Sequence, residues 1–254
     1  MRANTARKSL QEGKPILGVL LGFNSPAFVE FCALAGFDFV MFDCEHGPMS
    51  VESLENLVRA ADAAGIVPFA RVPRCEPSTI LRFLDTGVLG LLVPHVETAA
   101  DAVAAVRAAK YPPLGDRGLG MARSADYGAR MPTAEYIRMA NEETMVLALV
   151  ESASGLANAA EIAAVPGVDV VHIGPSDLSM SLGFFGQPEH PDVQTAIDRI
   201  IADTRAAGKV SGSGGIRGAP ALRRALDRGI RCVTYGARDL VVDSGRQLLR
   251  DAGR

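Results

Sequence analysis

The stretches Met145-Val-Leu-Ala-Leu-Val-Glu151 and Val168-Asp-Val-Val-His-Ile-Gly-Pro-Ser-Asp177 decide the fold. Each begins with an apolar run of strand length, which is typical of a strand buried on both faces of a parallel sheet. Each then ends in a turn that carries a carboxylate, Glu151 in the first stretch and Asp177 in the second. Because a parallel α/β barrel keeps its chemistry at the carboxyl ends of its strands, the two stretches predict a functional face as well as two strands.

Six further apolar runs have the length of strands, and helical patterns lie between all of them. Strands that alternate with helices indicate right-handed βαβ units, and eight such units indicate closure into a (β/α)8 TIM barrel. We therefore expect residues 1–254 to form one α/β domain. The predicted strands are Ile16–Leu21, Phe37–Phe42, Val67–Val72, Gly90–Val93, Met145–Val150, Val168–Ile173, Lys209–Gly212 and Arg231–Thr234.

Composition excludes several classes of protein. The 254 residues are 48% hydrophobic, enough for a large core, while the formal net charge is −3 and the basic residues are scattered. We therefore expect neither a nucleic-acid groove nor a membrane-binding surface. The apolar runs are too short to span a bilayer, the first ten residues lack the apolar core of a signal peptide, and the four cysteines form no C-x-x-C pair. These features predict a cytoplasmic protein with reduced thiols.

Glu151 and Asp177 are the candidate metal ligands. Hard divalent cations bind oxygen, and Mg²⁺ commonly takes one or two carboxylates together with water and substrate oxygens. Alternatively, either carboxylate alone stabilises the N-terminus of the helix that follows it. Their occurrence together, after two successive strands, favours the metal site.

His46 and Arg71 are the candidate catalytic residues. His46 lies in the turn Asp43-Cys-Glu-His46 that follows a predicted strand, where a histidine is suited to act as a general base. Asp43 or Glu45 is positioned to fix its tautomer. Arg71 ends another predicted strand and is suited to neutralise a developing oxyanion. The alternatives are a loop histidine with structural hydrogen bonds and a structural ion pair of the arginine. His95, which follows Gly90–Val93, is a weaker candidate.

The distribution of lysine argues against one class of aldolase. Schiff-base chemistry requires a lysine amine inside the site. The chain has four lysines, and none follows the carboxyl end of a predicted strand; they are Lys8, Lys14, Lys110 and Lys209. Metal stabilisation of an enolate is the natural alternative.

Two connections stand out. The long segment 111–131 lies between a predicted helix and the strand Met145–Val150, and we expect it to cover a site or a subunit contact. The segment Ser211-Gly-Ser-Gly-Gly-Ile-Arg-Gly218 follows a predicted strand. Its backbone N–H groups are suited to hold an anion, or it is simply a flexible rim loop.

These motifs resemble those of the HpcH/HpaI aldolase family, the metal-dependent class II pyruvate aldolases. The resemblance runs nearly from end to end of the chain. The matching segments are Gly36-Phe-Asp38, Asp43-Cys-Glu-His-Gly-Pro48, Leu92-Val-Pro94, Arg107-Ala-Ala-Lys-Tyr-Pro-Pro-Leu-Gly-Asp-Arg-Gly-Leu-Gly120, Glu151, Ile173-Gly-Pro-Ser-Asp-Leu-Ser179 and Gly186-Gln-Pro-Glu-His-Pro191.

The resemblance implies a barrel of the phosphoenolpyruvate/pyruvate type. It implies that a 4-hydroxy-2-oxo acid is cleaved into an aldehyde and pyruvate, or a close 2-oxo acid such as hydroxypyruvate, through an enolate. The implied metal is Mg²⁺, Mn²⁺, Co²⁺ or Zn²⁺, with Glu151 and Asp177 as ligands. His46 matches the base, which acts with a metal-bound water, and Arg71 matches the essential arginine.

Further implications concern supporting residues and assembly. Asp43 and Asp85 match acidic residues that support the histidine, Asp85 from this or a neighbouring subunit. The backbone N–H groups of Ser176 and Asp177 match those that hold the pyruvate carboxylate. The family forms hexamers, as trimers of dimers, with the eighth helix exchanged between neighbours. Close alternatives are decarboxylation of a 2-oxo diacid such as oxaloacetate and, more distantly, a non-catalytic barrel that senses a ligand.

The chain departs from the family on the aldehyde side. Many members have Gln where this chain has Leu149, Trp where it has Leu20, and an apolar loop where it has Ser211-Gly-Ser-Gly214. Polar walls reward a hydroxylated aldehyde. We therefore expect hydroxyaldehydes to be accepted at least as well as succinic semialdehyde, unless the loop alters only the flexibility of the rim.

Overall fold

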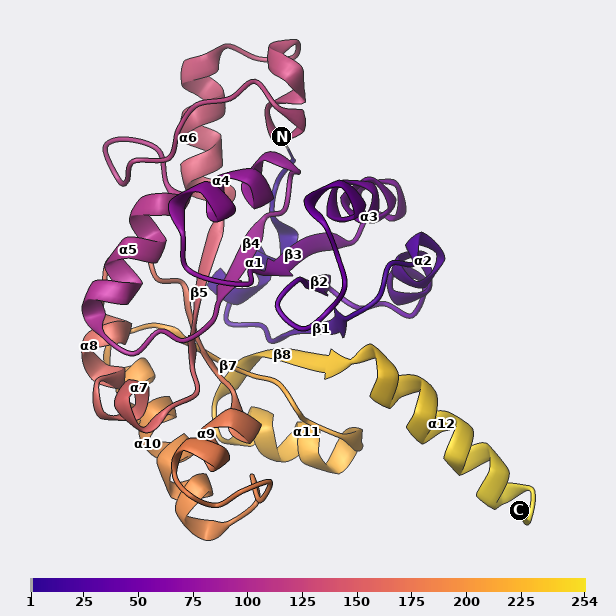
Figure 1. Ribbon diagram of the computed structural model, residues 1–254. Coiled ribbons are helices and arrows are strands. Elements are labelled where there is room, and N and C mark those ends of the chain that lie inside the picture. Colours follow the sequence, from indigo (N-terminus) through magenta and orange to yellow (C-terminus); the bar gives the residue numbers. More distant parts are fainter. Residues whose placement is uncertain (1) are drawn as a thin grey trace.

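The computed structural model describes residues 2–254 and contains a closed ring of eight parallel strands. Each strand pairs with the next along the chain, and β8 pairs with β1 to close the barrel (Figure 1). The predicted (β/α)8 fold is therefore confirmed. The strands are β1 Ile16–Leu21, β2 Phe39–Asp43, β3 Val67–Arg71, β4 Gly90–Val93, β5 Met145–Val150, β6 Val170–Ile173, β7 Val210–Ser213 and β8 Ile230–Gly236.

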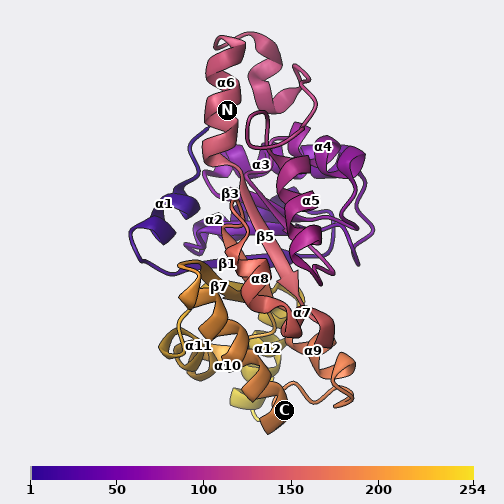
Figure 2. The same ribbon diagram turned by 90° about the vertical axis from the view of Figure 1, so that its left-hand side faces the viewer.

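Helices surround this ring, and α12 extends away from it (Figures 1 and 2). Their bounds are α1 Thr5–Gln11, α2 Pro26–Leu34, α3 Val51–Ala64, α4 Pro77–Asp85, α5 Ala99–Ala109, the 3₁₀ helix η1 Arg123–Gly128, α6 Thr133–Glu143, α7 Ala153–Ala157, α8 Ala159–Ala164, α9 Pro175–Ser181, α10 Pro191–Ala206, α11 Gly218–Asp227 and α12 Ala237–Asp251. Within residues 2–254, no helix is both long and apolar enough to cross a membrane.

Helix ends follow the predicted start and stop signals closely. Ser50 and Thr98 each form a capping box with the residue three positions on, which satisfies amide groups that the first turn leaves without partners. Gly65 ends α3 in the left-handed conformation, with φ of 77°, as a C-terminal glycine commonly does. Helices α1 and α9 have only seven residues each, too few to show a clear helical periodicity in the sequence.

The inside of the barrel is filled by side chains of uneven size. The rings of Phe39 on β2 and Phe69 on β3 stack with centroids 4.8 Å apart. A Cβ added at Gly18 would approach the Phe39 ring to 2.4 Å, and one added at Gly90 would approach the Phe69 ring to 2.5 Å. These two glycines therefore make room for the phenylalanines, and the packed interior closes the barrel beneath the carboxyl ends of the strands.

The segment 111–131 is anchored to the barrel by arginines. Arg117 stacks over the Tyr111 ring at 4.7 Å and donates to Asp85 at the end of α4, with 2.9 Å between Nη2 and Oδ1. Arg123 pairs with Asp62 on α3 and donates to the carbonyl of Thr86. Together with η1 and α6, this segment forms the part of the molecule farthest from α9 and α11 in Figure 1.

Candidate active site

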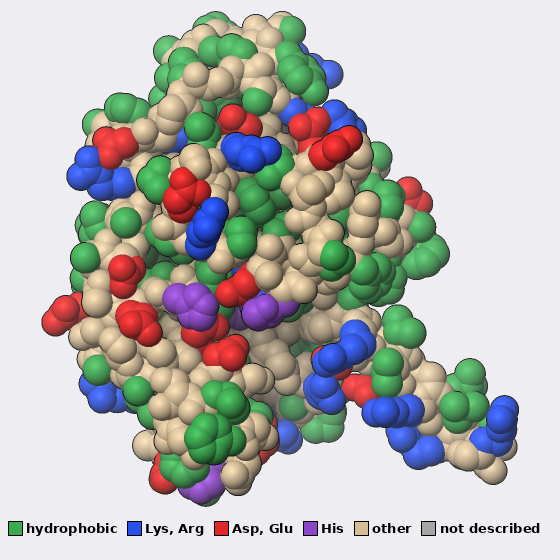
Figure 3. Space-filling model, in the orientation of Figure 1, with side chains coloured by type: hydrophobic (Ala, Val, Ile, Leu, Met, Phe, Trp, Pro, Cys, Tyr) green, Lys and Arg blue, Asp and Glu red, His purple; other side chains and the backbone are tan. Residues whose placement is uncertain are grey.

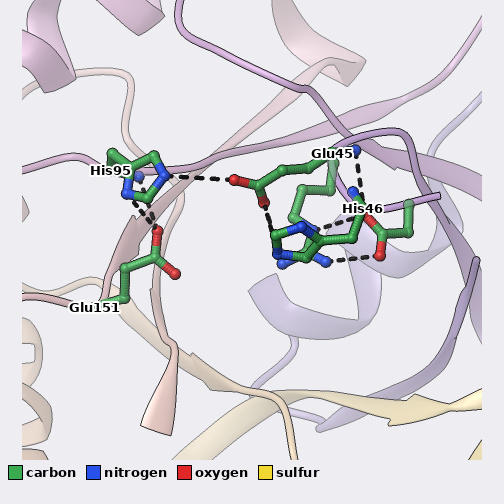
Figure 4. Close-up of polar contacts among 6 residues, drawn as sticks. Glu45, His46, His95 and Glu151 are labelled. Atoms are coloured by element: carbon green, nitrogen blue, oxygen red, sulfur yellow. Dashed lines mark hydrogen bonds and ion pairs between the residues drawn. The ribbon is translucent and has the colours of Figure 1, made fainter. Parts of the chain in front are cut away.

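Ionisable side chains from the ends of neighbouring strands converge on one face of the barrel. Glu45 and His46 follow β2, Arg71 ends β3, His95 follows β4 and Glu151 follows β5. Histidine and acidic side chains gather at the centre of this face in Figure 3, and Figure 4 shows how four of them approach one another. The site thus lies at the carboxyl ends of the strands, where the barrel rule predicts it.

Arg71 is held between two carboxylates. Its Nε and Nη2 donate to Asp43 Oδ1 and Oδ2 at 3.0 and 2.7 Å, and its Nη1 lies 3.2 Å from Glu45 Oε2. Burial opposes ionisation of Asp43, but Arg71 and two backbone N–H groups outweigh it and hold the pKa of Asp43 below its ordinary value. This bidentate geometry fixes the guanidinium plane, which a lysine in its place could not reproduce.

Glu151 is almost fully buried, with 5% of its side chain exposed. Burial raises its pKa, the N–H group and charge of His95 oppose that rise, and the nearby charges of Asp177 and Glu45 add to it. Its Oε1 accepts the backbone N–H of His95 at 3.0 Å and lies 3.2 Å from His95 Nδ1. The ionised form of Glu151 is therefore unfavourable in this buried position unless a further positive group approaches it.

Asp177 lies beside Glu151, as the sequence predicts. Strand β5 pairs with β6 up to Val150 and Ile173, so the turns that follow the two strands are neighbours. Asp177 is exposed in the first turn of α9. Gly174 packs closely against Glu151, since a Cβ there would lie 2.9 Å from Glu151 Oε2.

This pair has the chemistry of an open divalent-metal site. Both donors are carboxylates, which suit a hard cation such as Mg²⁺, and the desolvation of Glu151 favours a neighbouring positive charge. Among residues 2–254, no three His, Cys, Asp or Glu side chains are close enough together to form a metal cage. Two carboxylate donors fit a hard cation that takes its remaining ligands from water and substrate oxygens.

His46 is largely exposed, with 68% of its side chain accessible. Its Nε2 lies 3.9 Å from Glu45 Oε2, which makes Glu45 the nearest carboxylate partner of the ring. Asp43 instead accepts the backbone N–H groups of Glu45 and His46 at 3.2 Å each. Asp43 thus shapes the turn and holds Arg71, and its support of the His46 ring stays a prediction.

Asp85 lies apart from the ion pairs of this cluster, while Ser176 adjoins it through Asp177. Asp85 pairs with Arg117, and nothing in residues 2–254 of the same chain links it to His46 or Arg71. A role beside His46 would thus require Asp85 of a neighbouring subunit. Ser176 lies exposed in the first turn of α9, directly before Asp177.

Glu45 and His95 take a larger part in the ion-pair cluster than their places in the sequence predict. Glu45 is a second partner of Arg71, and His95 bridges Glu45 and Glu151, with Nε2 3.5 Å from Glu45 Oε1. Glu45 lies within the turn Asp43-Cys-Glu-His46, so the sequence already places it beside the other candidate residues. The position of the His95 ring depends on a left-handed backbone, with φ of 54°, which the sequence of a non-glycine residue does not predict.

The lysines are remote from this cluster, as predicted. Lys110 is buried, and its Nζ donates to the carbonyls of Asn141 and Thr144. Thr144 directly precedes β5, so Lys110 lies at the opposite end of that strand from Glu151. Burial lowers the pKa of Lys110 to about 8, with smaller contributions from nearby charges.

Comparison with known proteins supports the family resemblance that the sequence motifs indicate. Residues 17–213 match the model of the HpcH/HpaI aldolase/citrate lyase family. The chain is 39% identical to hydroxypyruvate/pyruvate aldolase of Delftia acidovorans, over 92% of this chain and 86% of that protein. It is 42% identical to 4-hydroxy-2-oxovalerate aldolase of Rhodococcus jostii, over 82% of this chain and 80% of that protein.

A solved structure agrees with these matches. An HpcH/HpaI aldolase/citrate lyase family protein from Burkholderia cenocepacia superposes with a TM-score of 0.92 and 35% identity, covering 99% of this chain and all of that one. The chain therefore belongs to the HpcH/HpaI aldolase/citrate lyase family.

Proposed function

We propose that this enzyme is a divalent-metal-dependent aldolase that reversibly cleaves 4-hydroxy-2-oxo acids into an aldehyde and pyruvate, or a close 2-oxo acid such as hydroxypyruvate. The observation that carries the proposal is the convergence of a buried carboxylate, an exposed carboxylate and a fixed guanidinium at neighbouring strand ends. The names of the relatives, which act on 4-hydroxy-2-oxo acids, support the same class of substrate.

Glu151 and Asp177 would hold the divalent cation. When bound, the cation supplies Lewis-acid polarisation of the substrate's 2-oxo group. The two carboxylates neutralise its charge, and the N–H groups at the start of α9, at Ser176 and Asp177, are suited to the substrate carboxylate. Because Glu151 is buried, its attraction for such a cation would be stronger than that of an exposed carboxylate.

Arg71 and His46 would carry out the proton and charge steps. In cleavage, His46 accepts the proton of the 4-hydroxyl group as the C3–C4 bond breaks and its electron pair passes to the 2-oxo acid fragment. The resulting enolate oxygen is stabilised by Arg71, whose guanidinium is already oriented by Asp43 and Glu45. Protonation at C3 then gives pyruvate, and the aldehyde leaves from the exposed side of His46.

We also propose that the protein assembles as a hexamer in which α12 packs on a neighbouring subunit. Ala237 is the only buried residue of α12, and apolar side chains on this helix remain exposed, including Val241 at 59% and Leu248 at 70%. Helix α2 likewise exposes Leu34 at 85%. Such apolar surface is typical of a subunit contact. Assembly would also allow Asp85 of one subunit to approach His46 of another.

The assembly has a direct test. Light scattering after size-exclusion chromatography is expected to give the mass of a hexamer for the wild type and a smaller mass for Leu248→Asp. Gln247→Asp is the control, because it adds the same charge one residue away on a neighbouring side of the helix. It is expected to change the mass of the assembly less than Leu248→Asp does. A wild-type monomer would contradict the proposed assembly.

The activity is tested by a screen for pyruvate release. The metal-stripped enzyme is assayed with a panel of 4-hydroxy-2-oxo acids and with oxaloacetate, after addition of Mg²⁺, Mn²⁺, Co²⁺ or Zn²⁺. The proposal predicts that 4-hydroxy-2-oxo acids are cleaved at higher kcat/KM than oxaloacetate is decarboxylated. The reverse order would favour a 2-oxo diacid decarboxylase that forms the same enolate. No turnover with any substrate and metal would contradict an aldolase.

A further inference from the structure

Two groups of His95, in the turn after β4, contact the same carboxylate oxygen of Glu151. The backbone N–H donates to Oε1 at 3.0 Å, and ring atom Nδ1 lies 3.2 Å from the same oxygen. This double contact requires the left-handed backbone of His95, with φ of 54°. Such a conformation is unfavourable in a non-glycine residue and typically persists where surrounding contacts hold it.

The other oxygen of Glu151 faces a different neighbour. Oε2 lies on the Gly174 side, where an added Cβ would come within 2.9 Å of it. Gly174 joins β6 to α9, the helix that carries Asp177 in its first turn. Because Oε1 is occupied by His95, Oε2 is the oxygen left on the side of the turn that leads to Asp177.

The far side of the His95 ring is held as well. Its Nε2 lies 3.5 Å from Glu45 Oε1, and Glu45 Oε2 contacts Arg71 Nη1 at 3.2 Å (Figure 4). The ring thus lies between the carboxylate of the metal-ligand pair and the carboxylate that orients the arginine, although 71% of the His95 side chain is exposed. Because most of the His95 side chain is exposed, packing does little to hold the ring. The polar contacts of its two nitrogens therefore define its orientation.

We propose that His95 is a positioning residue that holds Glu151 in a one-oxygen binding mode, with Oε2 presented to the divalent cation. The inference rests on the proposed metal site of Glu151 and Asp177. Partners that orient a metal ligand typically change metal affinity by about 10–100-fold when they are removed. The effect of His95 should therefore appear in metal binding itself, before any substrate is added.

The test is a titration of the metal-stripped, full-length protein with Mn²⁺, in which electron paramagnetic resonance measures free Mn²⁺. His95→Gly keeps the backbone N–H and removes the strain of positive φ, so it isolates the ring. His95→Asn tolerates positive φ and offers an amide N–H near the position of Nδ1. His190→Asn is the matched control, because His190 caps α10 and is not part of this cluster.

We expect His95→Gly to weaken Mn²⁺ binding by about 10–100-fold, and His95→Asn to recover most of that loss. His190→Asn should bind as the wild type does. Thermal unfolding of the stripped variants reports any loss of the fold separately, since a purely structural role would lower the melting temperature without changing Mn²⁺ affinity. Wild-type affinity in folded His95→Gly would overturn the positioning role. A wild-type protein that binds no Mn²⁺ would overturn the proposed metal site, and the positioning role with it.

Discussion

Removal of Arg71 should damage stability and catalysis through two separable effects. The side chains of Arg71 and Asp43 are 11% and 9% exposed, and that of Glu45 is 12% exposed. Arg71→Ala therefore leaves two largely buried carboxylates without their common partner. Breaking a buried pair by removing one member typically costs about 3–5 kcal/mol of unfolding free energy. Because the site opens to solvent beside His46, we expect about 3 kcal/mol, the lower end of that range.

The catalytic loss has a different cause. Arg71 is expected to stabilise charge that develops in the transition state, and loss of one such group typically lowers kcat by about 10²–10³-fold. A second substitution separates the two effects. Arg71→Ala combined with Asp43→Asn removes one of the two stranded charges, so it should recover part of the lost stability while activity remains low.

The assay compares wild type, Asp43→Asn, Arg71→Ala and the double variant. Urea denaturation gives the unfolding free energy, and coupled detection of pyruvate gives kcat/KM. Recovery of activity together with stability in the double variant would refute a direct catalytic role, because it would show that Arg71 serves only to balance Asp43. An undiminished unfolding free energy in Arg71→Ala would refute the argument from buried charge.

Three further predictions address the base, the buried lysine and the acceptor side. His46→Ala should lower kcat by about 10²–10⁴-fold while leaving Mn²⁺ affinity unchanged, and near-normal turnover would contradict its role as the base. Lys110 has a pKa lowered to about 8, against 10.5 for the free side chain. Between pH 8 and pH 10.5 the unfolded state therefore binds more protons than the folded state, so Lys110 makes the free energy of unfolding rise with pH in this range. Lys110→Met should remove about 2 kcal/mol of the rise between pH 7.5 and pH 10, measured by urea denaturation at those two pH values, and an unchanged pH slope would contradict the burial argument. Ser213→Leu should lower kcat/KM for glyceraldehyde relative to succinic semialdehyde in the condensation direction. If the wild type prefers succinic semialdehyde and the substitution leaves that preference unchanged, this loop does not set acceptor choice.

The strands and the carboxylate pair could be predicted because their signals are local. Met145–Val150 is apolar throughout and is observed with the predicted bounds, and Glu151 and Asp177 follow strands that are consecutive in the chain and therefore neighbours in a barrel. Strand β2 begins later than predicted, at Phe39, because the Asp38 side chain accepts the Leu17 N–H group instead.

The parts that were missed depend on contacts between distant segments. Asp43 and Glu45 lie close together in sequence, and only the direction of Arg71 from the next strand determines that both bind it. The contact of His95 with Glu151 joins the ends of β4 and β5 through an unusual backbone angle. Asp85 is paired with Arg117 of the long segment 111–131, whose path no periodic pattern predicts.

The most direct test of the account is the metal dependence of pyruvate release in the wild type, Glu151→Ala and Asp177→Ala. The account predicts that chelation abolishes activity in the wild type, that added Mg²⁺ or Mn²⁺ restores it there, and that neither variant recovers at the same metal concentration. Treatment of each sample with borohydride in the presence of substrate should trap no covalent adduct, because no lysine lies near the site. Full activity in the metal-free wild type, or a trapped imine, would contradict the metal-dependent mechanism.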